Sequence, residues 1–516
     1  MAGELCTWTL LLLVVGGTQG AKILGLFPFP AKSHMISFSP LLQELAHRGH
    51  EVTVVSSFPL KNPPPNFKDI VLDDLFPKQD IDKMFSLQDQ KSFYSILMFI
   101  AMGGSAICEQ NLRQPNIQKL LADKDLHYDV IIFESFFSEC FFGVVHKMNA
   151  PVILISANTV TLWLGDPAGN PHTTSYIPDS IAAHRTDMTF KERLINSLNA
   201  VLYVGLRELV ILPRQDAAMR RVLDDPTIPS VADIERNTSL MLLNTHFSMT
   251  FPRPFTPNTI DVGGMHIKPP QKLPKELKKF LDEAPHGVIY FSLGSNVRSA
   301  NMPESMRLGL LEAFSGLKEQ VLWKWETDTL PGKPANVRTE KWLPQNDILA
   351  HPNVRVFMTH GGLLSVQEAT YFGIPLLAIP VMGDQRPNAA RAQDAGYALF
   401  LDPWNVTRES VSWALGELLT KPSYRENAKR ISALFKDRPQ SPLETAVHWT
   451  EYVIRHKGAR HLRSAATDLY LFQYFLLDVL GVLLAGLGCV VFAVWYVCKA
   501  LFSRKSTKTS RAKKTN

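Results

Sequence analysis

The chain is poor in cysteine, and this excludes several classes of protein. Five cysteines in 516 residues cannot form the dense disulfide framework of a small secreted domain. Cys6 lies in the first apolar run, and Cys489 and Cys498 lie in or beside the last one, so only Cys108 and Cys140 remain in the body. These two could pair, but without a CxxC spacing they do not predict a zinc site.

The chain also lacks an excess of one charge over most of its length. Its formal net charge of +6 at first suggests a basic protein with an anionic partner. However, seven Lys and Arg residues and no acid follow Val497, which leaves 47 basic residues against 48 acidic ones in the rest. We therefore expect no nucleic-acid partner and assign the excess to a short tail.

Two common nucleotide-binding motifs are absent as well. No GxGxxG follows the first predicted strand, and the chain has no Walker A sequence. The first absence argues against a nicotinamide-dependent oxidoreductase, and the second argues against a P-loop enzyme. A nucleotide site in this chain must therefore be built from other residues.

Two uncharged apolar runs near the ends of the chain differ in length. The first, residues 5–16, is shorter than the roughly 20 residues that a membrane-crossing helix needs, and small residues follow it up to Gly20. It predicts a secretory signal over residues 1–20, although its first six residues contain no Lys or Arg. The second run, residues 479–497, covers about 28 Å as a helix and predicts a transmembrane segment.

The basic tail, residues 498–516, follows the second run directly. Because cytosolic flanks carry the excess of Lys and Arg, we predict a single-pass type I topology with the body outside the cytosol. The terminal pair Lys513-Lys514 resembles the dilysine retrieval signal of endoplasmic-reticulum membrane proteins, although a chance pair in a basic tail is equally probable. In a luminal body, the N-x-S/T triplets at Asn237 and Asn405 would be glycosylation sites.

Between the two runs, short apolar strands alternate with helices in two cycles. A loop over residues 29–35 follows the first strand, and residues 36–48 have helical apolar spacing that ends at Gly49. This alternation predicts parallel, doubly wound sheets and an α/β fold. The predicted strands of the two cycles are residues 22–28, 51–56, 129–134 and 151–156, and then 287–295, 321–326, 353–360 and 375–381.

A segment rich in proline and glycine, Pro252–Pro274, separates the cycles and is the best candidate for a domain boundary. Two α/β domains joined in this way predict a cleft between them, which is a favoured place for a ligand. An amphipathic helix, Pro442–His456, is expected to lead toward the membrane. The predicted parts are an amino-terminal domain (21–265), a second domain (280–440), a returning helix (441–465), the transmembrane helix (479–497) and the tail (498–516).

Residues 342–385 contain the most informative motif. A predicted strand ends at His360 and passes through Gly361-Gly362 into a helix. The N–H groups and the dipole at a helix N-terminus favour phosphate, and glycine allows it to approach closely. His360 could add a charge-assisted donor. Glu368, six residues beyond Gly362, lies on the helix and can accept hydrogen bonds from two sugar hydroxyls.

The same segment contains groups suited to a base and to a sugar. Trp342 offers a flat face for a base, with Gln345 beside it, although a tryptophan at this place could equally be part of the core. Asp384 and Gln385 follow the next strand at the carboxyl edge of the sheet and suit a ligand rich in hydroxyls. Together with the glycine turn, these residues predict a nucleotide-sugar site.

The combined spacing resembles the signature of the UDP-dependent glycosyltransferases with two Rossmann-like domains, a family that includes glucuronosyl- and glucosyltransferases of animals and plants. The resemblance covers nearly the whole chain, and its details are most like those of insect members. It implies a GT-B type fold in which two Rossmann-like domains face a cleft, with one C-terminal transmembrane helix. It also implies that the domain over residues 21–265 binds the acceptor and that the domain over residues 280–440 binds the UDP-sugar. The matching positions are Trp342, Pro344, Gln345, His351, His360, Gly362, Ser365, Glu368, Gly373, Pro375, Pro380, Asp384 and Gln385.

The resemblance assigns the nucleoside and the sugar to separate residues. It implies that Trp342 stacks on uracil, that Gln345 contacts the nucleoside and that Glu368 holds the ribose hydroxyls. It also implies that Asp384 and Gln385 hold the transferred sugar. The UDP-sugar is then a co-substrate, and no cofactor is expected.

The diphosphate is assigned to the glycine turn and its surroundings. The resemblance implies that Ser295, His360 and Ser365 contact the diphosphate, with Gly362 in the same UDP-binding turn. Many relatives have Asn at the position of Leu364, and vertebrate relatives have Gly at the position of Ser365. The change at Leu364 removes one polar group that could contact the diphosphate.

Two residues of the amino-terminal half are candidates for catalysis. His34 follows the first strand and titrates near neutrality, which suits a general base. Glu134 ends another strand at the same edge and could orient the imidazole ring. A lone loop histidine is usually solvated, but in the family a His here is the base, supported by an Asp or Glu at the position of Glu134. His47 and His50, at the helix–strand turn, are expected to be structural.

Two DxD triplets, Asp80–Asp82 and Asp123–Asp125, resemble the metal-holding pattern of some glycosyltransferases. Neither caps an apolar strand, so we predict solvated turns and a reaction that needs no metal ion.

The predicted function is transfer of a hexose, with glucose first and glucuronate as the alternative, from a UDP-sugar to a hydroxyl of a small lipophilic or phenolic acceptor. The predicted mechanism is displacement with inversion, with His34 as the general base. A catalytically silent single-pass binding protein of the same fold is a further alternative. The predicted place is the endoplasmic-reticulum membrane, with the body in the lumen, and relatives often associate as homodimers.

Overall fold

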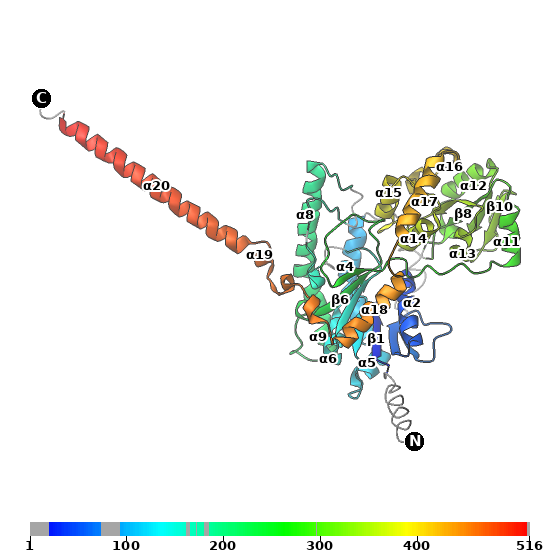
Figure 1. The fold of residues 1–516 in the computed structure, drawn as a ribbon, viewed down its shortest axis with the longest axis horizontal. Coiled ribbons are helices and arrows are strands. Elements are labelled where there is room, and N and C mark those ends of the chain that lie inside the picture. Colours follow the sequence, from blue (N-terminus) through cyan, green and yellow to red (C-terminus); the bar gives the residue numbers. More distant parts are fainter. Residues whose placement is uncertain are drawn as a thin grey trace, which may run out of the picture. The chain divides into compact units, whose positions relative to one another are not determined.

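The computed structural model describes residues 20–73, 93–160, 166–171, 173–179, 185–295 and 297–512 (Figure 1). The predicted signal, the triplet Asp80–Asp82 and the pair Lys513-Lys514 lie outside these residues, apart from Gly20 at the end of the signal. The chain divides into two compact units, the body (residues 1–463) and a C-terminal unit (residues 464–516).

The first half of the body is built on a seven-stranded sheet, and every paired strand is parallel to its neighbour. The strand order is β3-β2-β1-β4-β5-β6-β7, so the order reverses between β1 and β4. In open parallel sheets, ligands bind at the carboxyl ends of the strands where the order reverses. The strands are β1 (Lys22–Phe27), β2 (Glu51–Ser56), β3 (Phe67–Val71), β4 (Val130–Phe133), β5 (Val152–Ser156), β6 (Thr238–Leu243) and β7 (Thr259–Asp261).

Helices cover both faces of this sheet, because its central strands are apolar on both sides. The helix α2 (Lys32–His47) packs on one face, and α4 (Phe93–Leu112) packs on the other. The other elements of this half are α5 (Pro115–Ala122), η1 (Glu139–Phe141), α6 (Phe142–Met148), η2 (Asp166–Ala168), α8 (Phe190–Leu206), the π-helix η3 (Arg207–Ile211), α9 (Leu212–Leu223) and α10 (Val231–Glu235).

The second half of the body contains a six-stranded parallel sheet with the same kind of reversal. Its order is β10-β9-β8-β11-β12-β13, so the reversal lies between β8 and β11. The α/β prediction with two Rossmann-like sheets is therefore confirmed. The strands are β8 (Val288–Ser292), β9 (Gln320–Lys324), β10 (Val337–Glu340), β11 (Val354–Thr359), β12 (Leu376–Ala378) and β13 (Ala398–Phe400).

Two apolar clusters cover the faces of the second sheet. One contains α12 (Glu304–Ser315) and α16 (Arg408–Thr420), and the other contains α14 (Leu363–Phe372). The remaining elements are α11 (Lys275–Asp282), η4 (Ser299–Asn301), α13 (Gln345–Leu349), α15 (Gln385–Asp394), η5 (Pro403–Asn405) and α17 (Pro422–Lys436).

The chain then returns to the first half. The helix α18 (Pro442–Arg455) packs against α2 and contributes Ala446, Val447 and Val453 to the core of the first sheet. A short helix, η6 (Arg460–Leu462), ends the body. The helix α18 therefore follows the second half in the sequence but packs on the first.

Several details differ from the sequence predictions, and the strands β3, β6, β7, β10 and β13 were not among those predicted. The helix α2 begins at Lys32, whereas a loop was expected up to residue 35, because the polar first turn carries no apolar spacing. His34 therefore lies in the first turn of a helix and not in a loop. The proline-rich segment between the cycles is not all linker, since β7 lies within it and pairs with β6.

The C-terminal unit is helical and contains η7 (Ala465–Asp468), α19 (Leu471–Tyr474) and α20 (Leu477–Ala512). Within α20, residues Leu477–Phe502 are long and apolar enough to cross a membrane, and none of the most apolar stretch is buried. A second segment of the described residues, Phe190–Leu223 in the body, also has the required length and composition, but it is partly buried.

Candidate active site

The two residues predicted for catalysis meet beside the strand reversal of the first sheet. His34 is in the first turn of α2, which follows β1, and Glu134 directly follows β4. Nδ1 of His34 lies 2.9 Å from Oε1 of Glu134. When Glu134 is ionised, Nδ1–H donates to it, and the lone pair of Nε2 remains available to accept a proton.

Aromatic side chains surround this pair. The ring of Phe136 meets the His34 ring edge-on at 4.8 Å between centroids, and Phe29 stacks at 6.5 Å. Burial alone would lower the pKa of His34, but the charge and hydrogen bond of Glu134, together with the charge of Asp384, raise this pKa above its ordinary value. The imidazolium that forms when His34 accepts a proton is therefore stabilised by Glu134.

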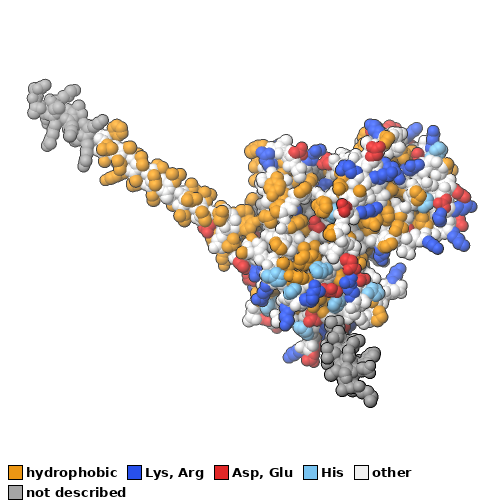
Figure 2. All heavy atoms as spheres, viewed as in Figure 1, with side chains coloured by type: hydrophobic (Ala, Val, Ile, Leu, Met, Phe, Trp, Pro, Cys, Tyr) orange, Lys and Arg blue, Asp and Glu red, His pale blue; other side chains and the backbone are white. Residues whose placement is uncertain are grey.

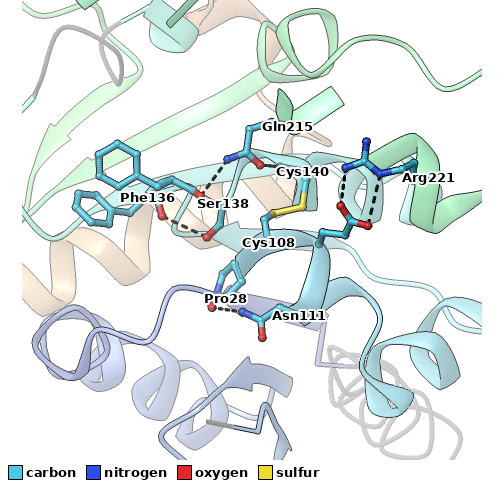
Figure 3. The surroundings of a disulfide bond; sticks show 10 residues. Pro28, Cys108, Asn111, Phe136, Ser138, Cys140, Gln215 and Arg221 are labelled. Carbon is cyan, nitrogen blue, oxygen red and sulfur yellow. Dashed lines mark hydrogen bonds and ion pairs between the residues drawn. A yellow bond between two sulfur atoms is a disulfide. The ribbon is translucent and has the colours of Figure 1, made fainter. Parts of the chain in front are cut away.

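A disulfide holds the loop after Glu134 in place (Figure 3). It joins Cys108 on α4 to Cys140 in η1, with 6.1 Å between the Cα atoms, and so answers the open question of whether these two residues pair. Gln215 on α9 donates to the carbonyl of Phe137 and accepts from the backbone N–H of Cys140, at 3.1 Å each. These contacts hold Phe137 in a left-handed conformation, with a φ of 52°.

The helix α4 also contacts the loop after β1. Asn111 donates to the carbonyl of Pro28 at 2.8 Å (Figure 3). One helix therefore supports both of the loops on which His34 and Glu134 depend.

Replacing both Cys108 and Cys140 by Ala is expected to lower the free energy of unfolding. The bond closes a loop with a sequence separation of 32, and loop-closure entropy for that length predicts a loss of about 3–4 kcal/mol. Thermal unfolding without reductant measures the effect. The control variant Cys489→Ser, at an exposed free cysteine, should unfold like the parent. Equal stability of the double variant and the parent would contradict a structural role for the disulfide.

The second sheet presents the glycine turn at its own reversal. His360 directly follows β11, and Gly294 follows the neighbouring strand β8. A Cβ atom at Gly294 would lie 2.6 Å from Cε1 of His360, and one at Gly362 would lie 2.5 Å from its Nε2. Only glycine at both positions leaves space for the ring. Ser295, which is exposed, lies next to Gly294 in this turn.

The turn leads into α14, which begins at Leu363 with Gly362 as its N-cap. Burial, with a smaller effect of the charge of Lys324, lowers the pKa of His360 to about 4. His360 is therefore neutral at physiological pH and can act as a neutral hydrogen-bond donor. The free N–H groups of the first helical turn supply the remaining donors for an anion.

Three of the predicted UDP-binding residues form one hydrogen-bonded group. The side-chain amide of Gln345 donates to Glu368 at 2.8 Å and to the Ser365 hydroxyl at 3.2 Å. Burial raises the pKa of Glu368 to about 7. The structure thus brings Gln345, Glu368 and Ser365 together, with Ser365 buried beneath the other two.

Trp342 is not a core residue. It is 68% exposed, and Nζ of Lys32 lies 5.8 Å from its ring centroid. An exposed indole has a free face on which a planar base can stack.

The predicted sugar-binding residues lie at the start of α15. Asp384 is the N-cap of this helix and accepts a hydrogen bond from Asn388 at 2.8 Å. Burial raises the pKa of Asp384 above its ordinary value, although the hydrogen bond from Asn388 and the charge of His34 offset part of this rise. The side-chain oxygen of Gln385 accepts from the N–H groups of Val381 and Met382, so only its amide N–H groups can reach a ligand.

Electrostatic and hydrogen-bond contacts connect the two halves at this place. Asp384 from the second half interacts with His34 from the first through its charge. A hydrogen bond also joins the two halves, from the Gln367 amide to the carbonyl of Asn244 at 3.0 Å. The predicted catalytic pair and the predicted donor site therefore belong to one site, although their residues are about 350 positions apart in the sequence.

Several other predicted residues lie away from this site. Asn237 and Asn405 are both exposed. His47 is exposed on α2, and Nδ1 of His50 accepts from the backbone N–H of Ala21 at 3.0 Å, a structural contact. Asp123 accepts from the backbone N–H of Asp125 in the turn after α5. In the part of the chain that the structure describes, no group of three His, Cys, Asp or Glu residues is arranged to hold a metal ion.

Comparison with known proteins accounts for this arrangement. The family described as "UDP-glucoronosyl and UDP-glucosyl transferase" matches residues 22–512. The chain belongs to this family. It is 38% identical over 516 residues to UDP-glucosyltransferase 2 of Dactylopius coccus, with 97% of this chain and 98% of that protein covered. It is 34% identical over 528 residues to UDP-glucuronosyltransferase 1A7 of Mus musculus, with 98% and 97% covered.

Solved structures agree on the fold of this UDP-glycosyltransferase. The UDP-glucose: anthocyanidin 3-O-glucosyltransferase in complex with UDP aligns with a TM-score of 0.57 at 18% identity. The alignment covers 85% of this chain and all of that one. The body therefore has the GT-B fold of two Rossmann-like halves.

One charged residue of this UDP-glycosyltransferase was not predicted from the sequence. Lys324 ends β9 and is buried, and its Nζ donates to the carbonyl of Gly294 at 3.0 Å and to Glu326 at 2.9 Å. It therefore places a positive charge beside the Gly294 turn, and this turn contacts the His360 ring. A lysine among the apolar residues of VLWKWE was the available signal, because a strand buried on both faces does not normally contain one.

Two further residues of the site were also missed. His266, in the proline-rich segment, lies with Nε2 3.3 Å from the Leu364 carbonyl and 3.5 Å from Glu368. Arg391, on α15, interacts with Asp384 through its charge and lies over the ring of Phe251 at 5.2 Å. Neither belongs to a local motif, so only the folded chain places them at the site.

Proposed function

We propose that this UDP-glycosyltransferase transfers glucose from UDP-glucose to a hydroxyl of a small lipophilic or phenolic acceptor, with inversion. The observation that carries the proposal is the His34–Glu134 pair, which interacts with Asp384 of the opposite half. A proton acceptor is thereby held beside a residue suited to sugar hydroxyls, as direct displacement requires.

In this reaction, Nε2 of His34 takes the proton of the acceptor hydroxyl. The acceptor oxygen then forms a bond to the anomeric carbon from one side, and the bond from that carbon to the diphosphate oxygen breaks on the other. UDP leaves with the electron pair of the broken bond. One displacement at one carbon inverts its configuration.

The departing diphosphate develops negative charge at the glycine turn. The N–H groups at the start of α14, His360 and the nearby charge of Lys324 can offset that charge. The proposed reaction therefore needs no metal ion, and a chelator should leave the rate unchanged.

The choice of glucose rests on the charges beside Asp384. A glucuronate carboxylate needs a cation, and Arg391, which interacts with Asp384, also interacts with the charge of Asp179. A neutral sugar makes no such demand. The relative from Dactylopius coccus is named a glucosyltransferase, whereas the mouse relative is named a glucuronosyltransferase.

A donor panel tests the function directly. The full-length protein is incubated with UDP-glucose, UDP-glucuronate or UDP-galactose and several small phenols, and the products are identified by mass spectrometry. A glucoside with the β configuration is expected. A glucuronide as the main product would show that the donor is UDP-glucuronate. If the protein binds UDP but forms no product and releases no UDP from any donor, it is a catalytically silent binding protein.

We further propose that the body faces the lumen of the endoplasmic reticulum and that α20 anchors it in the membrane. The disulfide between Cys108 and Cys140 fits an oxidising compartment, and Leu477–Phe502 has the length and composition of a membrane anchor. Asn237 and Asn405 are exposed, as glycan acceptors must be. Treatment of the cellular protein with endoglycosidase H should lower its mass, and an unchanged mass would contradict the luminal assignment.

A further inference from the structure

A row of large apolar side chains lies uncovered on the first half of the body. The helix α8 and the π-helix η3 after it expose these residues along one helical face, where positions four apart lie one above another. Figure 2 shows apolar side chains on the edge of the body where α8 lies in Figure 1. We call this row the α8 stripe, and it consists of Phe190, Leu194, Leu198, Val201, Leu202 and Leu209.

The stripe is a continuous row of strongly exposed apolar side chains, whereas apolar residues on most protein surfaces are scattered singly. Val201 is 71% exposed and Leu209 is 79% exposed. From Phe190 to Leu209 the helical rise covers about 28 Å. Soluble monomers rarely leave so continuous an apolar surface in contact with water.

The opposite face of the helix is tied to the body. The Asn196 amide donates to the carbonyls of Thr174 and Ile177, and its oxygen accepts from the N–H of Asp179. The Arg207 guanidinium binds both carboxylate oxygens of the buried Glu235, at 2.6 and 2.7 Å. Although Phe190–Leu223 has the composition of a membrane span, these buried polar contacts prevent it from crossing a bilayer as a free helix.

The charges are arranged at the ends of the stripe. No charged residue occurs between Arg193 and Arg207. Lys191 and Arg193 are exposed at the beginning of the helix, and Arg214 is exposed beyond its end. Glu192 is engaged in the capping box with Thr189, and Glu208, which precedes Leu209, pairs with Arg207 at 2.9 Å. An apolar face flanked by basic residues is the pattern of helices that lie in the headgroup layer of a membrane.

The length of the chain limits how far the body can be from its own anchor. Thirteen residues separate Arg463, the end of the body, from Leu477, the start of α20. Even fully extended, they span at most about 45 Å. If α20 crosses a bilayer, the lipid surface is therefore always within short reach of the body, and a weak apolar contact becomes effectively intramolecular.

We propose that the α8 stripe is a second membrane contact, which dips into the interfacial layer of the bilayer that α20 crosses. This inference rests on the proposed membrane anchor. The helix lies along the surface and does not span it, since its inner face remains bound to the body. A lipophilic acceptor dissolved in the bilayer would then meet the first half of the enzyme at the membrane surface.

The test uses the full-length protein in vesicles of phosphatidylcholine and phosphatidylserine that contain nitroxide-labelled lipids. Single cysteines are introduced by Leu198→Cys in the stripe, Leu434→Cys on α17 and Leu487→Cys in α20, each with Cys489→Ser and Cys498→Ser. All three sites are exposed in the structure, so the substitutions should leave the fold intact. An environment-sensitive fluorophore is attached, and the intact mass confirms one label per chain.

Quenching several-fold above that of position 434, with blue-shifted emission, is expected at position 198, and deeper quenching is expected at position 487. Quenching at 198 no greater than at 434, with 487 quenched, would overturn the α8 contact and leave the anchor intact. A blue shift at 198 without lipid quenching would assign the stripe to a second copy of the chain and also overturn the proposal. Absence of quenching at 198 and 487 would contradict both the anchor and the α8 contact.

Discussion

Replacing His34 by Ala should lower kcat for sugar transfer about 10³-fold, because proton transfer by a positioned base contributes about 10²–10⁴-fold. The effect on UDP binding should be small, since the residues expected to hold UDP lie in the second half of the body. A quenched-flow or coupled UDP-release assay at saturating donor measures kcat, and calorimetry measures the affinity for UDP.

Loss of activity in this variant has a second explanation that must be separated from the first. Glu134 is only 2% exposed, and removal of its partner leaves a buried carboxylate without the His34 contact, which can disturb the loop. His34→Asn keeps an N–H donor near the position of Nδ1 but supplies no base. If both variants fold, bind UDP and are equally inactive, the missing base is the cause.

A matched control lies on the same helix. His47 is exposed at the end of α2, and His47→Ala should retain full activity. Retained activity in His34→Asn would contradict the assignment of His34 as the base and leave it a role in packing against Glu134 and Phe136.

The sequence predicted best what depends on local pattern. Each strand that was predicted from the sequence is a short apolar run, and apolar runs that alternate with amphipathic helices favour a parallel sheet covered by helices. The glycine turn at Gly361-Gly362 was recognisable for the same reason, since its strand, turn and helix are consecutive. Neither required knowledge of any distant contact. The strands β3 (FKDIV) and β10 (VRTE) carry charged residues and were not predicted.

What the sequence could not predict depends on contacts between distant segments. Cys108 and Cys140 are 32 residues apart with no motif, and only the packing of α4 beside η1 makes them a pair. Lys324 and Gly294 are likewise joined only because β8 and β9 are neighbours. The orientation of His34 depends on the pairing of β1 with β4, which no spacing along the chain reveals.

The two sheets place their chemistry by the same rule. In the first, His34 and Glu134 follow β1 and β4, and in the second, Gly294 and His360 follow β8 and β11. Both pairs flank the point at which the strand order reverses. There the connections leave in opposite directions and open space for a ligand at the carboxyl edge. One architectural rule therefore predicts an acceptor-side base in one half and a phosphate-binding turn in the other.

The pH dependence of Glu134→Gln is the sharpest test of how these groups cooperate. The neutral form of His34 is the base, so kcat/KM should rise with pH as His34 loses its proton. In the parent, the pKa of His34 is raised, because the charge and hydrogen bond of Glu134 outweigh the effect of burial, with a further contribution from Asp384. The acidic limb of the parent profile should therefore lie above pH 6.5, the ordinary value for histidine.

In Glu134→Gln the raising charge is removed while burial remains, so the pKa of His34 falls and the acidic limb moves to lower pH. The plateau should nevertheless drop about 10²-fold, because the neutral amide no longer stabilises the imidazolium that forms during proton transfer. Glu44→Gln, which removes a carboxylate paired with Arg48 on the surface of α2, should change neither the limb nor the plateau. A lower plateau with an unmoved limb would show that the titrating base is a group other than His34. The pKa of His34 depends on the charge of Glu134 and must change when that charge is removed, whereas the pKa of a group far from Glu134 does not.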